Sequence, residues 1–104
     1  MDRYGIFARD FFTCQRCGSA PGIKGLQIAH RIKQGVGTEK YIKQYTDRMG
    51  YNFTKTYIVK KIINHPYNLV TTCSLKCNDS FNIFNKTVEM NILIDKILKQ
   101  LDIE

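Results

Sequence analysis

The sequence predicts a small α+β domain, and three observations lead to this fold class. Two short runs, at residues 26–32 and 69–72, have the alternation or the β-branched content of strands. Helix-like apolar spacing and capping residues occur between residues 38 and 63 and again after about residue 77. Two cysteine pairs separated by more than half the chain suggest a cross-link between its ends.

Length and composition fit one soluble domain. A chain of 104 residues is a single small domain by the usual length expectation, and its core is modest, so a metal cross-link would matter. No stretch approaches the roughly 18 apolar residues that cross a bilayer. The first residues, MDRYGIFARDFF, mix acidic and basic side chains and do not read as an export signal. We therefore expect a cytoplasmic protein without a membrane association.

The net charge of +7 is unevenly distributed. Residues 1–34 contain six basic and two acidic residues, and residues 35–64 contain the same numbers. Residues 65–104 contain four basic and five acidic residues. This distribution favours a polyanionic partner, with DNA as the first candidate, although a solvated lysine-rich surface would give the same charge.

The first third of the chain predicts a short helix, a turn and a strand. Residues 4–12 are apolar and aromatic, as expected for one or two helical turns. The run FTCQRCG is typical of a metal-binding knuckle, in which Gly18 permits a positive φ. In the strand over residues 26–32, alternation places four side chains on one face: Leu26, Ile28, His30 and Ile32.

Two helices are expected in the inserted segment, residues 35–64. Thr38 is a candidate N-cap for the first, which ends at Gly50 as a helix C′ glycine. The second covers residues 55–63, with Thr54 as a candidate cap, and must end before Pro66.

The last third predicts a strand followed by helices. The run at residues 69–72 ends at Cys73, and the pattern turns helical from about Cys77. A C-terminal amphipathic helix is expected over about residues 86–102. Its predicted apolar stripe is Val88, Ile92 or Leu93, Ile97 and Leu101. Packing of this stripe on the core is the simplest interpretation, and a dimerisation helix is the alternative.

The cysteines form the pattern C-x2-C, fifty-five residues, C-x3-C, through Cys14, Cys17, Cys73 and Cys77. Each pair can direct two thiolates at a common centre, so the four predict one structural zinc ion. The alternatives are four unrelated core thiols or two disulfides, and an intracellular protein makes disulfides the weaker interpretation.

Four segments together resemble the HNH nucleases, the ββα-metal endonucleases, in the subgroup whose fold is held by zinc. The segments, RDFFTCQRCG, LQIAHRI, HPYNLVTTC and CSLKCNDSFN, occur in the family's order. The resemblance covers residues 3–85, with a core motif at about residues 9–85. It implies a single HNH-type domain with additional helices, in which a ββα unit surrounds one divalent cation.

The resemblance assigns roles to three residues, in an H-N-N pattern. His30 matches the histidine that acts as the general base toward water. Asn68 matches the asparagine that braces the loop and orients this histidine. Asn78 matches the last position, at the start of a helix, where His or Asn binds the catalytic cation. A histidine base is suited to neutral pH, and an asparagine oxygen suits Mg²⁺ or another divalent cation.

One position departs from the family pattern. Ala29 stands where family members commonly carry Asp or His as a second metal ligand. Asp79 and Asn82 are therefore accessory candidates on the following helix. His65 is a third accessory candidate, with a structural role in a turn as the favoured interpretation.

Basic residues provide candidate contacts to DNA phosphates, which position a protein without reading sequence. Arg31, beside the predicted base, is the preferred candidate. The others are Lys33, Arg16, Lys40 and Lys43. The inserted segment either extends this DNA-binding surface or forms a homodimer contact, and both remain open.

Three functional hypotheses follow. The first is a metal-dependent endonuclease that hydrolyses DNA phosphodiester bonds. The second is a catalytically inactive, zinc-containing nucleic-acid-binding module, which Ala29 favours. The third is a protein-interaction module, which leaves the placement of the histidine and the two asparagines to chance. Free-standing proteins of this family often belong to phages, mobile elements or host defence.

Overall fold

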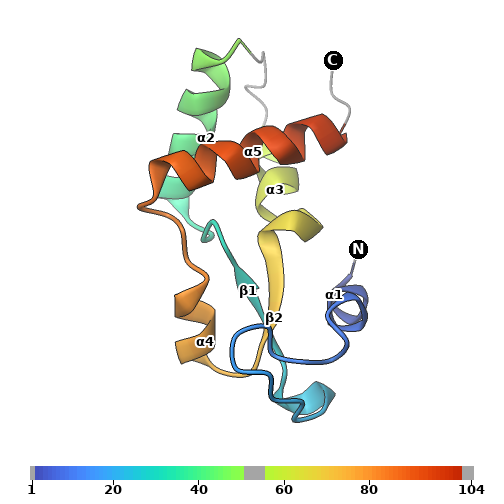
Figure 1. The fold of residues 1–104 in the computed structure, drawn as a ribbon. Coiled ribbons are helices and arrows are strands. Elements are labelled where there is room, and N and C mark those ends of the chain that lie inside the picture. The colour runs from blue at the N-terminus through green and yellow to red at the C-terminus, as the bar shows by residue number, and fades with distance from the viewer. Residues whose placement is uncertain (1, 51–55, 102–104) are drawn as a thin grey trace.

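The computed structural model describes residues 2–50 and 56–101, with the backbone alone for residues 56–58. Its elements, in chain order, are α1 (Arg3–Arg9), the 3₁₀ helix η1 (Ile23–Gly25), β1 (Gln27–His30), α2 (Val36–Arg48), α3 (Thr56–Ile63), the 3₁₀ helix η2 (Pro66–Asn68), β2 (Leu69–Thr72), α4 (Leu75–Ser80) and α5 (Thr87–Leu101). The molecule measures 43 × 25 × 20 Å and is therefore elongated (Figure 1).

The two strands form one antiparallel sheet, which confirms the α+β class. Gln27 lies opposite Thr72, and His30 lies opposite Leu69. Helix α4 packs beside β1, and α1 packs beside β2, so the helices flank the small sheet (Figure 1). This pairing brings residues 27–30 next to residues 69–72, although they are about forty positions apart in the chain.

The largest apolar cluster lies at the helical end of the molecule. Helix α5 crosses α2 and α3 there, while α4 and the loop after α1 lie toward the opposite end (Figure 1). The cluster consists of Ile32, Ile42, Tyr45, Val59, Ile62, Ile63, Ile83, Met90, Leu93, Ile94, Ile97 and Leu98. Outside this cluster, Ile6, Phe7 and Leu26 are buried beside the sheet, so the cysteine-bearing half has the smaller apolar core.

The buried side of α5 differs from the predicted stripe. Val88 is 71% exposed, so its assignment to the stripe was wrong, and of the alternatives Ile92 and Leu93 it is Leu93 that is buried. Ile97 is buried and Leu101 packs against the cluster, as predicted. The buried residues of the helix are Met90, Leu93, Ile94, Ile97 and Leu98. The helix has apolar residues on more than one side, and its spacing alone does not choose between them. The prediction that α5 packs on the core is confirmed.

Helix α2 begins earlier than its predicted cap. Gly35 is its N-cap, and Thr38 lies inside the first turn with its side chain fully buried. The predicted cap was therefore wrong. The predicted end is confirmed, because Met49 is the C-cap and Gly50 follows with φ of +86°. For the next helix, Thr54 and Lys55 lie outside the described residues, and α3 ends at Ile63 as expected.

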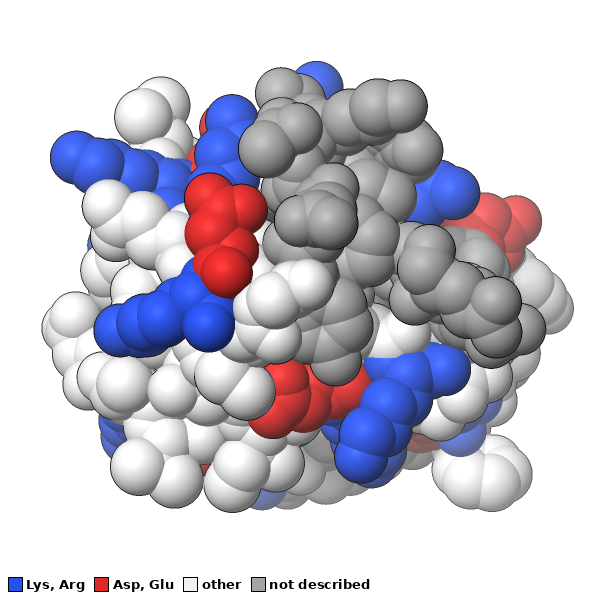
Figure 2. Space-filling view, turned by 90° about the horizontal axis from the view of Figure 1, so that it is seen from above, with Lys and Arg blue, Asp and Glu red and all other residues white. Residues whose placement is uncertain are grey.

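The helical end presents a mixed surface. Figure 2 looks down on it and shows basic side chains at several separate places, with acidic and neutral side chains between them. Lys40 on α2 is exposed and Lys43 is half-buried. No helix in the described ranges is long and apolar enough to cross a membrane.

Candidate functional site

The four cysteines converge on one point. Their Sγ atoms all lie within 4.8 Å of one another, with Cys17 and Cys73 3.4 Å apart and Cys73 and Cys77 3.9 Å apart. In a tetrahedral zinc site with Zn–S bonds of about 2.3 Å, the sulfurs are about 3.8 Å apart. All four are free thiols, so the disulfide alternative is wrong in this structure. The cluster could bind a zinc ion.

Local backbone structure directs each pair toward this point. In the first pair, Gly18 has φ of +80° and its N–H donates to Cys14 O at 2.9 Å, which closes the knuckle. The second pair begins where β2 ends. Ser74 caps α4 by accepting a hydrogen bond from the N–H of Cys77, which fixes the start of the helix. The knuckle is joined to β2 because Gln15 N–H donates to Thr71 O at 3.0 Å.

The thiols differ in acidity. The contact with Ser19 lowers the pKa of the Cys17 thiol to about 6. Hydrogen bonding with Ser74 also lowers the pKa of Cys77. The Ser19 contact favours the thiolate of Cys73 as well, but the neighbouring sulfurs outweigh it and raise the pKa of Cys73 to about 11. Adjacent thiolates repel, so ionisation of all four requires a cation between them.

A second site lies between β1 and α4. A polar cavity of about 350 Å³ is lined there by Ile28, Ala29, His30, Lys33, Gln34, Asn78, Asp79 and Asn82. It brings together the predicted base, the predicted cation ligand and the accessory candidates Asp79 and Asn82. Asp79 lies in α4, but Asn82 lies after the end of α4 and not on the helix, so that placement was wrong.

His30 is the last residue of β1 and is half-buried. Its Nε2 lies 3.3 Å from Oδ1 of Asn64, at the end of α3. In the tautomer that carries the proton on Nε2, this contact is a hydrogen bond and Nδ1 is the basic nitrogen. Asn64 was not predicted from the sequence, because its proximity depends on how α3 packs on the sheet.

Asn68 is fully buried outside the cavity and connects two loops. Its Oδ1 accepts from Ile32 N–H at 2.7 Å, and its Nδ2 donates to Ile32 O at 3.0 Å and Ile63 O at 2.7 Å. Its backbone O accepts from Arg31 N–H at 2.8 Å. These bonds fix the backbone directly after His30 to the end of α3. Asn68 is therefore placed to position His30 rather than to touch a ligand.

Asn78 lies in the middle of α4, not at a helix start as the resemblance implied, because Ser74 caps the helix four residues earlier. Its Nδ2 donates to Gln27 Oε1 at 3.0 Å, and its Oδ1 accepts from the Thr72 hydroxyl. An amide oxygen has two lone pairs, so one is left for a cation. Asp79 is exposed and is the one carboxylate among the residues that line this cavity.

Ala29 lies on the side of β1 that faces α4. It is two positions from Gln27, whose side chain contacts Asn78, and strand alternation places both on the same face. Ala29 is 3% exposed and lines the cavity without a ligating atom. The strand predicted over residues 26–32 is shorter in the structure, because β1 covers Gln27–His30 and leaves Leu26 and Ile32 outside it.

Four predicted residues remain: His65, Lys33, Arg16 and Arg31. His65 caps η2, because its Nδ1 accepts from Tyr67 N–H at 3.1 Å, and burial lowers the pKa of its imidazole. Lys33 lines the cavity of His30, with its Nζ 4.5 Å from the centre of the Phe84 ring. Arg16 is exposed in the knuckle. Arg31 lines a different, larger cavity of about 660 Å³.

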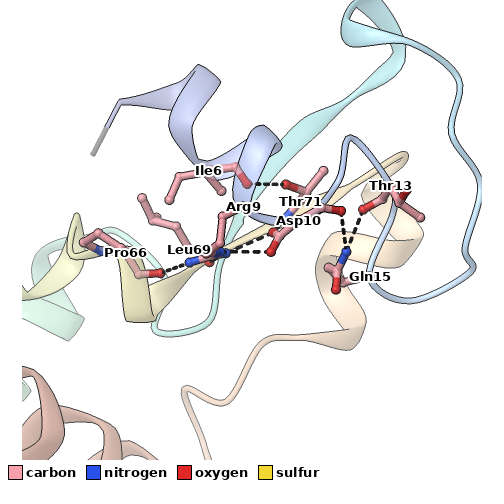
Figure 3. Close-up of polar contacts among 8 residues, drawn as sticks. All are labelled: Ile6, Arg9, Asp10, Thr13, Gln15, Pro66, Leu69 and Thr71. Carbon is pink, nitrogen blue, oxygen red and sulfur yellow. Dashed lines mark hydrogen bonds and ion pairs between the residues drawn. The ribbon is translucent and has the colours of Figure 1, made fainter.

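An ion pair beside the larger cavity was also not predicted from the sequence. Arg9 Nε and Nη2 donate to the two carboxylate oxygens of Asp10, both at 2.9 Å (Figure 3). Arg9 also donates to Pro66 O and Leu69 O, at 2.8 and 2.7 Å. Asp10 accepts from Thr71 N–H at 3.0 Å. Burial raises the pKa of Asp10, but these hydrogen bonds outweigh it and hold the pKa below its ordinary value.

Comparisons of the chain with protein-family models, with curated proteins and with solved structures found no match. A functional interpretation therefore depends on the two sites themselves.

Proposed function

We propose that this protein is a metal-dependent DNA endonuclease with a zinc-supported ββα-metal site. The observation that carries the proposal is the cavity between β1 and α4, which combines a histidine with amide and carboxylate oxygens. The four-cysteine cluster joins the knuckle after α1 to the end of β2 and to α4, so a zinc ion there would hold the helix that forms one wall of this cavity.

The side chains present fit a divalent cation of the magnesium type. Asn78 and Asp79 offer oxygen atoms, and Mg²⁺ is usually held by one or two protein oxygens, with water and phosphate completing its shell. Such a cation, when bound, would stabilise charge that develops on the phosphate and the leaving oxygen.

The reaction assigned to the protein residues is hydrolysis of a phosphodiester. His30 accepts a proton from water as the water oxygen forms a bond to phosphorus. The bond between phosphorus and the leaving oxygen breaks, and the leaving oxygen gains a proton from solvent. Asn64 and Asn68 would hold the imidazole and the following backbone in place. Lys33, in the same cavity, is the candidate for contact with the phosphate.

Plasmid nicking with Mg²⁺ or Mn²⁺ tests the proposal. His30→Ala should lower the cleavage rate by about 10²–10⁴-fold, the usual contribution of a general base. His65→Gln is the matched control, because His65 is the other histidine and caps a turn outside the cavity. Unchanged cleavage by His30→Ala, in protein whose folding is verified by its melting curve, would refute the assignment.

The second candidate function is DNA binding without catalysis. Ala29 favours it, since this wall position of the cavity offers no ligand, and Asn78 already has two partners within the protein. This function predicts salt-sensitive DNA binding by the wild type and no nicking with any divalent cation. The same nicking assay, combined with a binding assay, separates the two functions.

A further inference from the structure

Helix α1 ends in an unusual way. The Phe12 N–H donates to Phe7 O at 2.8 Å, and the Phe11 N–H donates to Ala8 O at 3.1 Å. This pair of bonds is the Schellman motif, in which the C′ residue adopts a left-handed conformation and is usually glycine. Here the C′ residue is Phe11, with φ of +58°, and Phe12 follows with φ of +52°.

Phe11 combines two unfavourable features. A bulky residue with positive φ is a genuine outlier, because its Cβ crowds the backbone. Its side chain is also 84% exposed, so the ring gains little from burial in the fold. Glycine at this position would avoid both costs. The ring is therefore better explained by a contact outside the chain than by the stability of the domain.

The loop that carries Phe11 is rigidly held. The Thr13 hydroxyl donates to Phe11 O at 2.8 Å. Gln15 Nε2 donates to Asp10 O at 3.0 Å and to Thr13 O at 2.9 Å (Figure 3). Asp10 is in turn fixed by Arg9 and by the backbone of β2. A preformed loop lowers the entropy lost when the ring binds a partner.

The charges beside this loop select the partner. Asp10 and Gln15, on either side of Phe11, line the larger cavity, whose other charged residues are Arg9, Arg31, Glu89 and Lys96. Arg16, one residue beyond Gln15, is exposed. Arg9 is exposed, but its guanidinium is already bonded to Asp10 and to two carbonyl oxygens. An exposed aromatic ring, whose chain neighbours line a cavity that contains cations, is a combination that suits unpaired nucleobases and their phosphates.

We propose that Phe11 stacks on an unpaired base of a bound DNA strand, while Arg31, Lys96 and Arg16 contact its phosphates. The inference rests on the proposed function for its choice of DNA. An unpaired base is the favoured occupant because it presents a free face to the ring, whereas bases in a duplex are already stacked on each other. The expected substrate is therefore a single strand, or a duplex with unpaired nucleotides.

Phe11→Gly gives opposite predictions for stability and for binding. The variant should unfold at a higher temperature than the wild type, because glycine accepts the positive φ without crowding. Its binding to a single-stranded oligonucleotide, measured by fluorescence anisotropy, should be about tenfold weaker, as expected for the loss of one stacked base. Val36→Ala is the control, since Val36 is 83% exposed on α2 and away from this loop.

Equal binding by Phe11→Gly and wild type would overturn the inference. So would a wild type that nicks duplex DNA but does not bind a single strand, a result that leaves the proposed nuclease standing. The opposite result, in which binding depends on Phe11 but no cation supports cleavage, refutes the nuclease and supports the stacking contact.

Phe11→Trp provides a direct signal, because the chain contains no tryptophan. Stacking on a base should quench the fluorescence of the new indole when the oligonucleotide is added. Val36→Trp, at the control position, should show no such quenching. Binding that leaves the fluorescence of Phe11→Trp unchanged would show that the ring does not stack and would overturn the inference.

Discussion

Two buried polar side chains, Asn68 and Thr38, differ sharply in how their hydrogen-bonding groups are used. Asn68 uses both its amide oxygen and its amide nitrogen in hydrogen bonds to the backbone of Ile32 and Ile63. Thr38 is fully buried in α2, and its hydroxyl has no hydrogen-bond partner among the described residues. An unsatisfied buried hydroxyl costs about 1–3 kcal/mol, so Thr38 is a site of avoidable instability.

Thr38→Val should therefore stabilise the protein by about 1 kcal/mol, because valine has nearly the same shape and removes the unpaired hydroxyl. Urea unfolding measures the difference. Thr46→Val is a matched control in the same helix, since the Thr46 hydroxyl is buried but donates to Ile42 O at 2.8 Å. This control should not be stabilised. A Thr38→Val variant less stable than the wild type would contradict the account.

At the scale of residues, residue types and spacing predicted part of the candidate site. The four cysteines were identified because metal-ligand spacing is visible in sequence, and the structure brings them together. His30, Asn78, Asp79 and Asn82 share a cavity, although their chemical roles remain proposals. Asn64, and the bonds of Arg9 and Asp10 to residues 66–71, could not be found in this way, because these contacts depend on the packing of elements distant in sequence.

At the scale of elements, the strands were easier to predict than the helices. Residues 69–72 were predicted as a strand, and β2 has these bounds. For α5, apolar residues occur on more than one side of the helix, and the packing against α2 and α3 decides that Ile94 is buried and Val88 is exposed. For α2, Thr38 resembled a cap, but Gly35 already starts the helix and buries the threonine one turn later.

The short helix η2 links the pH dependence of stability to His65. Its Nδ1 accepts a hydrogen bond from Tyr67 N–H, and protonation would remove this acceptor. Because burial lowers the pKa of His65 in the folded state, the unfolded chain binds the proton first as the pH falls. The contribution of the neutral imidazole is therefore present at pH 7 and is lost as the pH falls below about 6.5, its ordinary value.

We expect the wild type to lose more stability than His65→Gln between pH 7.5 and 5.5, and the difference should be small because solvent screens this partly exposed group. Urea unfolding at a series of pH values measures both proteins. The two proteins differ at residue 65 alone, so the difference isolates His65. If the stability of the two proteins changed in parallel with pH, the cap formed by His65 would not be coupled to the protonation of its imidazole.

At the scale of the whole molecule, the fold has an apolar end and a cysteine end. The main apolar cluster lies among α2, α3 and α5, whereas the cysteines join the loop after α1 to the end of β2 and to α4. The sequence predicted the zinc cross-link but not this separation, because the position of a core is set by how the helices pack. Metal removal should consequently loosen the cysteine end of the molecule before the apolar end.

The last prediction concerns that asymmetry. Zinc that binds only the folded state adds about 4 kcal/mol of stability when its free concentration exceeds the dissociation constant about a thousandfold. A strong chelator should therefore lower the melting temperature, and amide exchange should accelerate first in α4 and the knuckle, and later in α2 and α5.

Elemental analysis should find one zinc per chain. Cys77→Ser should reproduce the chelated state in the absence of chelator, and the chelator should then have little further effect. A wild type without zinc, with a melting temperature unchanged by the chelator, would leave the cysteine cluster without its proposed function and α4 without the support that the cavity of His30 requires.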